Sequence, residues 1–230
     1  MRSTAPRRAI VPALRPSEYT AALIQVLQAE PGRVSGAKAL EIGSGSGVVL
    51  ATLGMLRAAA LCGVDIEPEA IVAGTRLLEV MGLGAIAEFH RGDMWLPVAG
   101  RRFDLIVANL PHFPMAPTQI GDRLPTWSSG GDDGRWLLDP FIEGLSAHLA
   151  PGGRAVLTHN GFVGLDRSRE IACAHGLSLA VLSTVLVHIP PDKFERMTPA
   201  VCAAEEGRSI LRYGPYTFGQ MHIVEIGAAA

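Results

Sequence analysis

The sequence predicts an α/β fold: a doubly wound, mostly parallel sheet with helices on both faces and a reversed last strand. Short apolar segments of strand length alternate with segments whose apolar residues have helical spacing. Glycine or proline stands at most of the boundaries between them. A glycine-rich loop joins the first strand to the helix that follows it. Alternation of this kind is typical of parallel strands connected by helices.

In the first half of the chain, local signals set the boundaries. The segment Arg15-Pro16-Ser17-Glu18 predicts a helix start, and Pro31-Gly32 ends that helix. Pro68 suits the first turn of a later helix, which Gly82 follows. The elements predicted here are helix 17–28, strand 39–42, helix 48–56, strand 60–64, helix 68–81 and strand 85–89.

In the second half, segment 103–108 is the strongest strand, because an unbroken apolar run leads up to Asn109. A loop rich in proline, glycine and aspartate, residues 110–134, separates this strand from a helix with an apolar stripe. Pro151-Gly152-Gly153 predicts a turn. The remaining predicted elements are helix 135–149, strand 155–158, helix 167–175 and strands 177–189 and 221–226.

Length and charge predict one domain over residues 1–230 and disfavour a nucleic-acid partner. The 230 residues are 48% hydrophobic and suit a single well-buried core. The formal net charge is −2, whereas proteins that bind nucleic acid usually carry a basic excess. An N-terminal arm, residues 1–16, is locally basic, and this keeps a tRNA substrate open as an alternative.

Three scattered cysteines, Cys62, Cys173 and Cys202, predict neither a disulfide framework nor a metal site. The first residues lack an apolar core of signal-peptide length, and the most apolar later stretch is interrupted by polar residues. We therefore expect a cytoplasmic protein without a membrane span. The sequence leaves the oligomeric state open, a homodimer included.

The segment 190–220 departs from the alternation. A reversed last strand needs only a short hairpin, yet about thirty residues intervene, and they include Phe194, Tyr213, Tyr216 and Phe218. Long loops in compact domains are usually functional or disordered. The aromatic side chains favour an insertion that acts as a lid.

Three consecutive strands end in groups that could bind one ligand. Gly43, Gly45 and Gly47 form a G-x-G-x-G loop, which lets backbone approach a ligand but differs from the spacing of dinucleotide binders. Asp65 ends the second strand, where a carboxylate can accept two hydrogen bonds from a ribose diol. Asp93 follows the third strand and can accept from an exocyclic amine, while Met94 packs on a ring. The set predicts an adenosine-containing cofactor with no pyrophosphate.

These segments resemble a class I S-adenosylmethionine-dependent methyltransferase. The resemblance covers about residues 15 to 188 and rests on E-I-G-S-G-S-G, V-D-I, R-G-D-M, F-D-L-I-V-A-N-L-P-H and L-A-P-G-G-R-A-V-L. It implies a Rossmann-like, seven-stranded sheet and S-adenosyl-L-methionine as cofactor. The residues implied to bind the cofactor are Glu41, Gly43, Gly45, Gly47, Asp65, Ile66, Asp93, Met94 and Asn109.

Asn109-Leu110-Pro111-His112 is similar to the N-P-P-Y/F tetrad of amino- and amide-nitrogen methyltransferases, above all the release-factor glutamine methyltransferase family. Arg15-Pro16-Ser17-Glu18 and the loop 130–134 support this resemblance. Leu110 and His112 depart from the tetrad, and residues 1–16 have no counterpart of that family's N-terminal helical domain. The resemblance therefore implies the methyl-transfer chemistry more strongly than it implies the substrate.

The tetrad would hold a planar nitrogen for methylation. Such an amide nitrogen is a poor nucleophile, so the protein must align it and exclude water. The Asn109 side-chain oxygen and the Leu110 carbonyl would accept its N–H groups, and Pro111 would stiffen the loop. His112 is either a ring stacked on the target or a base for a more acidic N–H or O–H group. We expect Phe113 and His159 to contact the substrate as well.

The resulting hypothesis is an N-methyltransferase that acts on an amide or heterocyclic nitrogen of a small molecule. The missing recognition domain and the aromatic insertion favour a closed pocket over a protein surface. The alternatives are a protein glutamine N-methyltransferase, a tRNA-adenine methyltransferase and a non-catalytic, cofactor-binding partner subunit. A nucleotide-sugar or nicotinamide enzyme is a further alternative, but the G-x-G-x-x-G spacing that would support it is missing.

Overall fold

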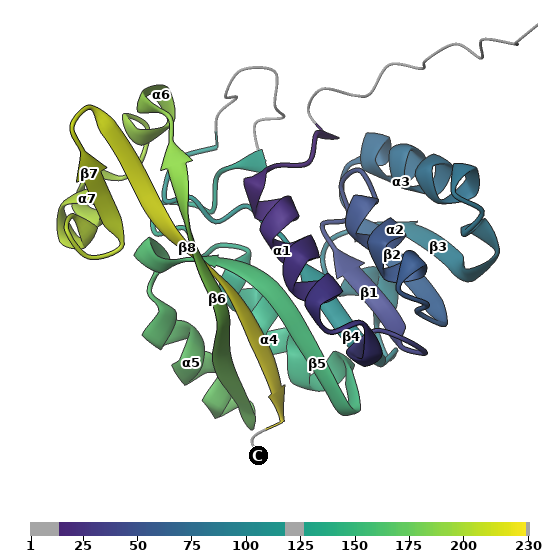
Figure 1. Ribbon diagram of the computed structural model, residues 1–230. Helices are drawn as coiled ribbons and strands as arrows, with labels where there is room; N and C mark the ends of the chain where they lie inside the picture. The colour runs from purple at the N-terminus through teal and green to yellow at the C-terminus, as the bar shows by residue number, and fades with distance from the viewer. Residues whose placement is uncertain (1–13, 118–126, 229–230) are drawn as a thin grey trace, which may run out of the picture.

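The computed structural model describes residues 14–117 and 127–228, and its core is one eight-stranded sheet (Figure 1). Seven strands follow in the order β3-β2-β1-β4-β5-β8-β6, and β7 pairs with β8 outside this path. The strands are β1 (Lys38–Ile42), β2 (Ala60–Asp65), β3 (Ala87–Arg91), β4 (Phe103–Ala108), β5 (Leu149–Asn160), β6 (Leu177–Ile189), β7 (Ile210–Tyr213) and β8 (Tyr216–Ala228). β1 to β5 pair in parallel, whereas β8 runs antiparallel to its three neighbours. The predicted α/β class, the mostly parallel sheet and the reversed last strand are confirmed, but β7 adds an eighth strand to the seven that the resemblance implied.

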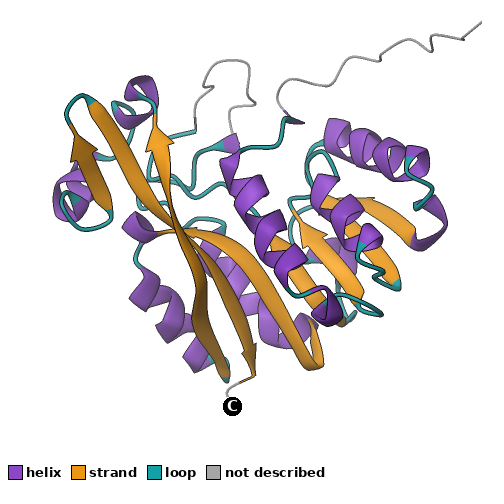
Figure 2. Ribbon diagram, in the orientation of Figure 1, coloured by secondary structure: helices purple, strands orange, loops and turns teal. Residues whose placement is uncertain are grey.

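Helices cover both faces of the sheet (Figure 2). The helices are α1 (Glu18–Ala29), α2 (Val48–Met55), α3 (Pro68–Val80), α4 (Leu138–His148), α5 (Leu165–Ala174), α6 (Pro191–Phe194) and α7 (Pro199–Glu205). α1, α2 and α3 pack on one face, and α4 and α5 on the other. Within residues 14–117 and 127–228, no helix is long and apolar enough to cross a membrane.

Strands β4 and β6 have the predicted bounds, but two other elements start two or three residues later than expected. A 3-10 turn (Gly84–Ile86) occupies the predicted start of the third strand, because the amide of Ile86 bonds back to Leu83. Helix α4 begins at Leu138 rather than at Arg135. The Trp136 amide instead donates to the carbonyl of Gly130 at 2.8 Å, which closes the preceding loop.

Pro151-Gly152-Gly153, predicted as a turn before a four-residue strand, lies within the 12-residue strand β5. Here the pairing with β4 jumps from Phe103↔Leu149 to Leu105↔Arg154, and Gly152 has a φ of 74°. The segment is therefore a bulge, in which glycine supplies the positive φ. The far end of β5 extends two residues beyond the prediction, to Asn160.

The insertion 190–220 also differs from the predicted irregular link. It contains α6, α7 and β7, and its last residues open β8, which is 13 residues long rather than six. The insertion packs on the long loop before α4: the Thr198 amide donates to the carbonyl of Pro114 at 2.6 Å. Lys193 Nζ lies 3.2 Å from the centroid of the Phe113 ring. Its role as a lid stays a prediction, and most of the N-terminal arm lies outside the described residues.

Candidate active site

The glycine loop after β1 turns sharply at the carboxyl edge of the sheet. Gly43, Gly45 and Gly47 have φ values of 70°, 49° and 76°, a region that glycine tolerates best. The Gly43 amide donates to the carbonyl of Val64 at 2.8 Å, and the Gly45 amide donates to Asp65 Oδ2 at 2.8 Å. The second strand thus ties down the loop, and the predicted cofactor residues lie together.

The three glycines have different roles. A methyl group at Gly47 would lie 2.7 Å from Cα of Gly74, so this glycine allows α2 and α3 to approach closely. At Gly43 a methyl group would lie 3.1 Å from Leu110 Cδ2, and at Gly45 it would lie 3.9 Å from the Trp127 ring. The sequence predicts that all three serve close approach to a ligand, and in the structure the space beside Gly47 is occupied by the backbone of α3.

Two buried carboxyl groups adjoin this loop. Asp65 is 8% exposed and accepts from the Glu67 amide at 2.9 Å, in addition to its bond from Gly45. Glu41 is 3% exposed, and its Oε2 has no hydrogen-bond partner among the described residues. Burial raises the pKa of Asp65 and raises the pKa of Glu41 well above its usual value. The hydroxyl of Ser44 is also buried without a partner among these residues. Unpaired acceptors beside a glycine loop fit a cationic ligand with hydrogen-bond donors.

The residues expected around the adenine lie at the same edge. The Gly92 amide donates to the carbonyl of Asp65 at 2.9 Å, which brings Asp93 next to the second strand. Ile66 is 57% exposed, Asp93 is exposed, and Met94 is half-buried with a φ of 43°. The sequence analysis gave no role to Trp127, whose ring lies beside the glycine loop. The only sequence feature that could have indicated it is that an aromatic residue stands in the long loop 110–134.

Asn109 sits where β4 leaves the sheet, and two threonines orient its amide. The Thr158 hydroxyl donates to Asn109 Oδ1 at 2.8 Å, and Asn109 Nδ2 donates to Thr20 Oγ1 at 3.3 Å. Thr158 belongs to β5 and Thr20 to α1. A carbonyl oxygen has two lone pairs, so Asn109 Oδ1 can accept one further hydrogen bond. The half-buried amide is therefore held ready for a donor from a ligand.

His112 lies inside the protein next to this asparagine. It is 3% exposed, and its Nδ1 bonds to the carbonyl of Leu110. Because a carbonyl only accepts, Nδ1 must carry the hydrogen, and Nε2 keeps a lone pair that has no partner among the described residues. Burial lowers the pKa of His112 to about 4, so the ring is neutral near pH 7. Its neighbours are the Tyr19 ring, 5.8 Å away between centroids, and Phe113 at 6.4 Å.

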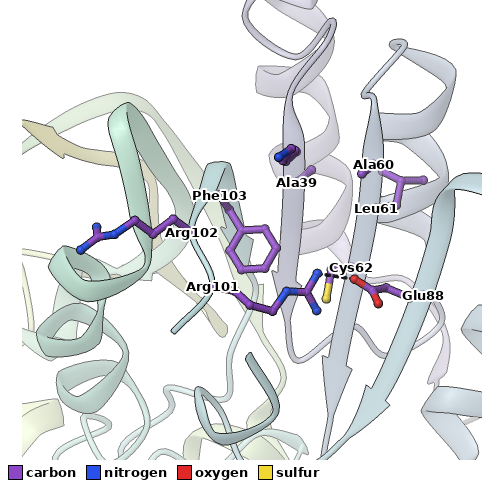
Figure 3. Close-up of a pocket in the computed structure, with 9 residues that line it drawn as sticks. Ala39, Ala60, Leu61, Cys62, Glu88, Arg101, Arg102 and Phe103 are labelled. Carbon is purple, nitrogen blue, oxygen red and sulfur yellow. Dashed lines mark hydrogen bonds and ion pairs between the residues drawn. The ribbon is translucent and has the colours of Figure 1, made fainter. Parts of the chain in front are cut away.

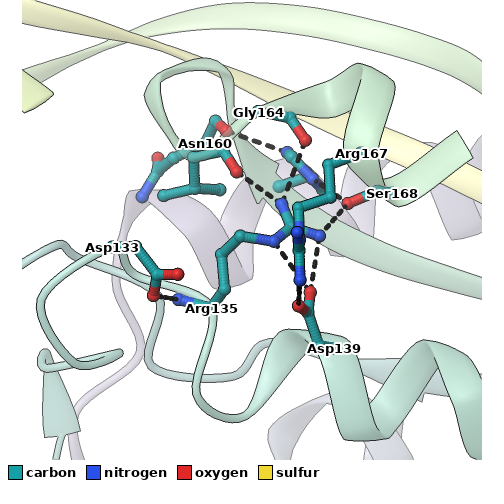
Figure 4. Close-up of polar contacts among 9 residues, drawn as sticks. Asp133, Arg135, Asp139, Asn160, Gly164, Arg167 and Ser168 are labelled. Atoms are coloured by element: carbon teal, nitrogen blue, oxygen red, sulfur yellow. Dashed lines mark hydrogen bonds and ion pairs between the residues drawn. The ribbon is translucent and has the colours of Figure 1, made fainter. Parts of the chain in front are cut away.

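His159, which we expected to contact the substrate, has both ring nitrogens bonded within the protein. It is fully buried, with Nδ1 2.8 Å from the carbonyl oxygen of Asn160 and Nε2 2.8 Å from Ser168 Oγ. Figure 4 shows the surrounding cluster, in which Arg135 contacts Ser168 at 2.9 Å and pairs with Asp139. Both ring nitrogens are thus used by the protein itself, so the geometry favours a structural role. Strand alternation explains the difference, because residue 159 faces α5 whereas residues 158 and 160 face α1.

A hollow of about 240 Å³ lies at the opposite edge, near the amino ends of β1, β2 and β4 (Figure 3). Potential metal ligands of Cys62, Glu88 and His90 lie within 4.8 Å of one another there. The Arg101 guanidinium pairs with Glu88 and lies 3.4 Å from His90 Nε2. The arginine thus supplies the positive charge that a metal ion would otherwise bring to this cluster. Burial raises the pKa of Cys62 to about 12, which keeps its thiol protonated and a poor ligand.

Comparisons with known proteins find methyltransferases. The methyltransferase domain family matches residues 39–122. Human methyltransferase HEMK2 is 32% identical over 146 residues, which are 60% of this chain and 67% of HEMK2. The release factor glutamine methyltransferase of Gloeobacter violaceus is 28% identical over 149 residues, which are 61% of this chain and 51% of that protein. The chain thus spans about half the length of the release factor glutamine methyltransferases that it matches.

Solved methyltransferases share the fold. A chain of the E. cuniculi Mtq2–Trm112 complex matches with a TM-score of 0.57 at 16% identity, over 94% of this chain and 98% of that chain. This likeness concerns the fold alone. The sequence relatives go further, because human HEMK2 is 32% identical and is matched over 67% of its own length. The chain therefore belongs to the class I S-adenosylmethionine-dependent methyltransferases, in the group that contains HEMK2 and the release factor glutamine methyltransferases.

Proposed function

We propose that this chain is an S-adenosylmethionine-dependent N-methyltransferase that methylates the side-chain amide of a glutamine in a protein substrate. The observation that carries the proposal is Asn109, whose amide two threonines hold at the carboxyl edge of the sheet. Relatives named release factor glutamine methyltransferase support a glutamine amide. They favour this alternative over a small-molecule substrate.

The cofactor would be held by the glycine loop and its acids. Glu41 and Ser44 offer buried acceptors without partners among the described residues, and Asp65 stands beside them. Ile66, Asp93, Met94 and Trp127 would surround the adenine. When bound there, S-adenosylmethionine would supply an activated methyl group, so the protein needs to orient the acceptor and exclude water.

The residues after β4 would orient the acceptor amide. Asn109 Oδ1 and the Leu110 carbonyl each keep one lone pair beyond the bonds that they already accept from Thr158 and His112. Two acceptors suit the two N–H groups of a primary amide. His112 stays neutral, and its free Nε2 could take the proton that the amide nitrogen releases, because an N-protonated amide is far more acidic than imidazolium.

The test is transfer of an isotope-labelled methyl group to candidate acceptors, read by mass spectrometry at residue level. Acceptors should include intact bacterial release factors, glutamine peptides, small N-heterocycles and unmodified tRNA. Because a fold neighbour was solved in a complex with Trm112, the assay should also be run after addition of an extract from the source cells. Methylation of a glutamine side chain is expected; transfer only to a heterocycle or to tRNA would overturn the protein-substrate proposal.

Cofactor binding should release a proton. Burial raises the pKa of Glu41 in the free protein, and a bound cation would favour the ionised form and lower that pKa. Affinity for S-adenosylmethionine should therefore strengthen as the pH rises, until Glu41 is ionised in the free protein as well. Calorimetric titration in buffers of different ionisation enthalpy measures the released proton directly.

The control pair for this prediction is Glu41→Gln and Glu79→Gln. Glu79 is exposed on α3, so its variant should keep both the affinity and the proton release. The Glu41 variant should bind more weakly and lose the proton release. If the enthalpy of S-adenosylmethionine binding to the wild-type protein does not change with the buffer, no proton is released, and Glu41 is not the group that binds the cation.

A further inference from the structure

Asn160, the last residue of β5, is fully buried, yet its side-chain NH₂ has no hydrogen-bond partner among the described residues. Its side-chain oxygen is held, because the Tyr19 hydroxyl donates to Oδ1 at 2.7 Å. A buried donor without an acceptor is destabilising, because it loses its hydrogen bonds to water and gains none from the protein. Buried polar groups of this kind are uncommon in native proteins and need an explanation.

The topology places this donor beside the acceptor site. β4 and β5 pair in parallel with Ala108 opposite Leu157, so both strands reach the carboxyl edge together. Side chains two residues apart share a face, which puts Asn160 on the same face as Thr158, the partner of Asn109. In Figure 4 the amide of Asn160 points away from the Arg135 cluster on the other face.

Helix α1 packs on this face and contacts both asparagines. Its consecutive residues Tyr19 and Thr20 contact Asn160 and Asn109 respectively. The Tyr19 ring also packs edge-on against His112, with the centroids 5.8 Å apart. Asn160, Asn109 and His112 thus all contact the same short stretch of α1.

We propose that Asn160 recognises the substrate amide by donating a hydrogen bond from Nδ2 to its carbonyl oxygen. This inference rests on the proposed function. A primary amide has two N–H donors and one carbonyl acceptor, and the site has two acceptors, Asn109 Oδ1 and the Leu110 carbonyl, with one donor. An amine lacks the oxygen, and a carboxylate lacks the N–H groups that the two acceptors require. Sites built to bond a polar group discriminate strongly against analogues that lack it.

Tyr19 would be the positioning residue for this contact. Its hydroxyl occupies Asn160 Oδ1 and so directs the NH₂ of the same amide toward the substrate. Removing the hydroxyl leaves the ring against His112 but frees the Asn160 amide to rotate. Tyr19→Phe should therefore weaken recognition of the amide in the same direction as loss of Asn160, and to a smaller extent.

The experiment uses the full chain saturated with S-adenosylhomocysteine and two peptides, Ac-Ala-Gln-Ala-NHCH₃ and its Met counterpart, which has similar length and no primary amide. Peptide affinity is measured by calorimetry for the wild-type protein, Asn160→Leu and Asn160→Asp. Asn160→Leu should weaken the affinity for the Gln peptide about 10- to 100-fold and change the affinity for the Met peptide by no more than about twofold. Asn160→Asp keeps the shape and the acceptor for Tyr19, so it tests the loss of the donor without a cavity.

Two controls separate this inference from the proposed function. Unchanged affinity of both variants for S-adenosylhomocysteine shows that they are folded, and methyl transfer to the Gln peptide is measured in parallel. An equal loss on both peptides, no loss on either, or no preference of the wild-type protein for the Gln peptide would overturn the inference. Absence of transfer to any glutamine acceptor by a wild-type protein that binds S-adenosylmethionine would overturn the proposed function, and the inference with it.

Discussion

Replacing Asn109 by alanine is expected to reduce methyl transfer about 100- to 1000-fold while S-adenosylmethionine still binds. Losing one preorganised hydrogen-bonding group of an active site typically costs this much. Asn109 Oδ1 is such a group, because the Thr158 hydroxyl and Thr20 fix its direction. Single-turnover transfer of a labelled methyl group, beside a calorimetric titration of the cofactor, measures the two effects separately.

Thr158→Val is the matched control, because it keeps Asn109 and removes only the hydroxyl that orients it. Its rate of methyl transfer should lie between the rates of the wild-type protein and of Asn109→Ala, about tenfold below the wild-type rate. Full activity of Asn109→Ala would place the chemistry elsewhere. Cofactor binding by the wild-type protein with no transfer to any acceptor would instead support a non-catalytic partner subunit.

Replacing Gly47 by alanine is expected to lower the free energy of unfolding by about 2–4 kcal/mol, even without cofactor. A methyl group there would lie 2.7 Å from Cα of Gly74, and backbone cannot move aside as a flexible side chain can. Overpacking costs about 1–3 kcal/mol, and the positive φ of 76° adds about 1 kcal/mol for a residue with a Cβ. Thermal unfolding should show a midpoint about 5–15 °C lower.

Gly82→Ala separates these two costs. Gly82 has nearly the same φ, 73°, but a methyl group there would meet nothing within 4 Å. It should therefore show the backbone cost alone, at about 1 kcal/mol. Equal destabilisation by both substitutions would mean that the α2–α3 contact contributes nothing. A Gly47 variant of wild-type stability that binds the cofactor poorly would return Gly47 to a direct role at the ligand.

Elements whose reasons are local could be predicted from the sequence. β4 ends where Pro111 cannot continue a ladder, and the glycine loop follows the first strand directly. Strand β6 has the predicted bounds because proline and glycine flank its apolar run. The bulge in β5 could not be predicted, since Pro151-Gly152-Gly153 reads as a turn until pairing with β4 draws it into the strand. β7 and the long β8 were missed because their hairpin draws its stability from β6.

In the candidate site, too, some features follow from local sequence and others depend on contacts between distant segments. Sequence alone determined the family and predicted the glycine loop with its acids and Asn109 as the candidate site, because these depend on residue type at fixed spacing. Only the tertiary structure decided that Gly47 lies against Gly74, that His159 turns toward α5, that Tyr19 bonds to Asn160 and that Trp127 lies beside the glycine loop. These roles depend on which residues from distant segments meet, such as Tyr19 and Asn160. Local sequence holds no record of such contacts, because packing of α1 and the strand alternation of β5 create them.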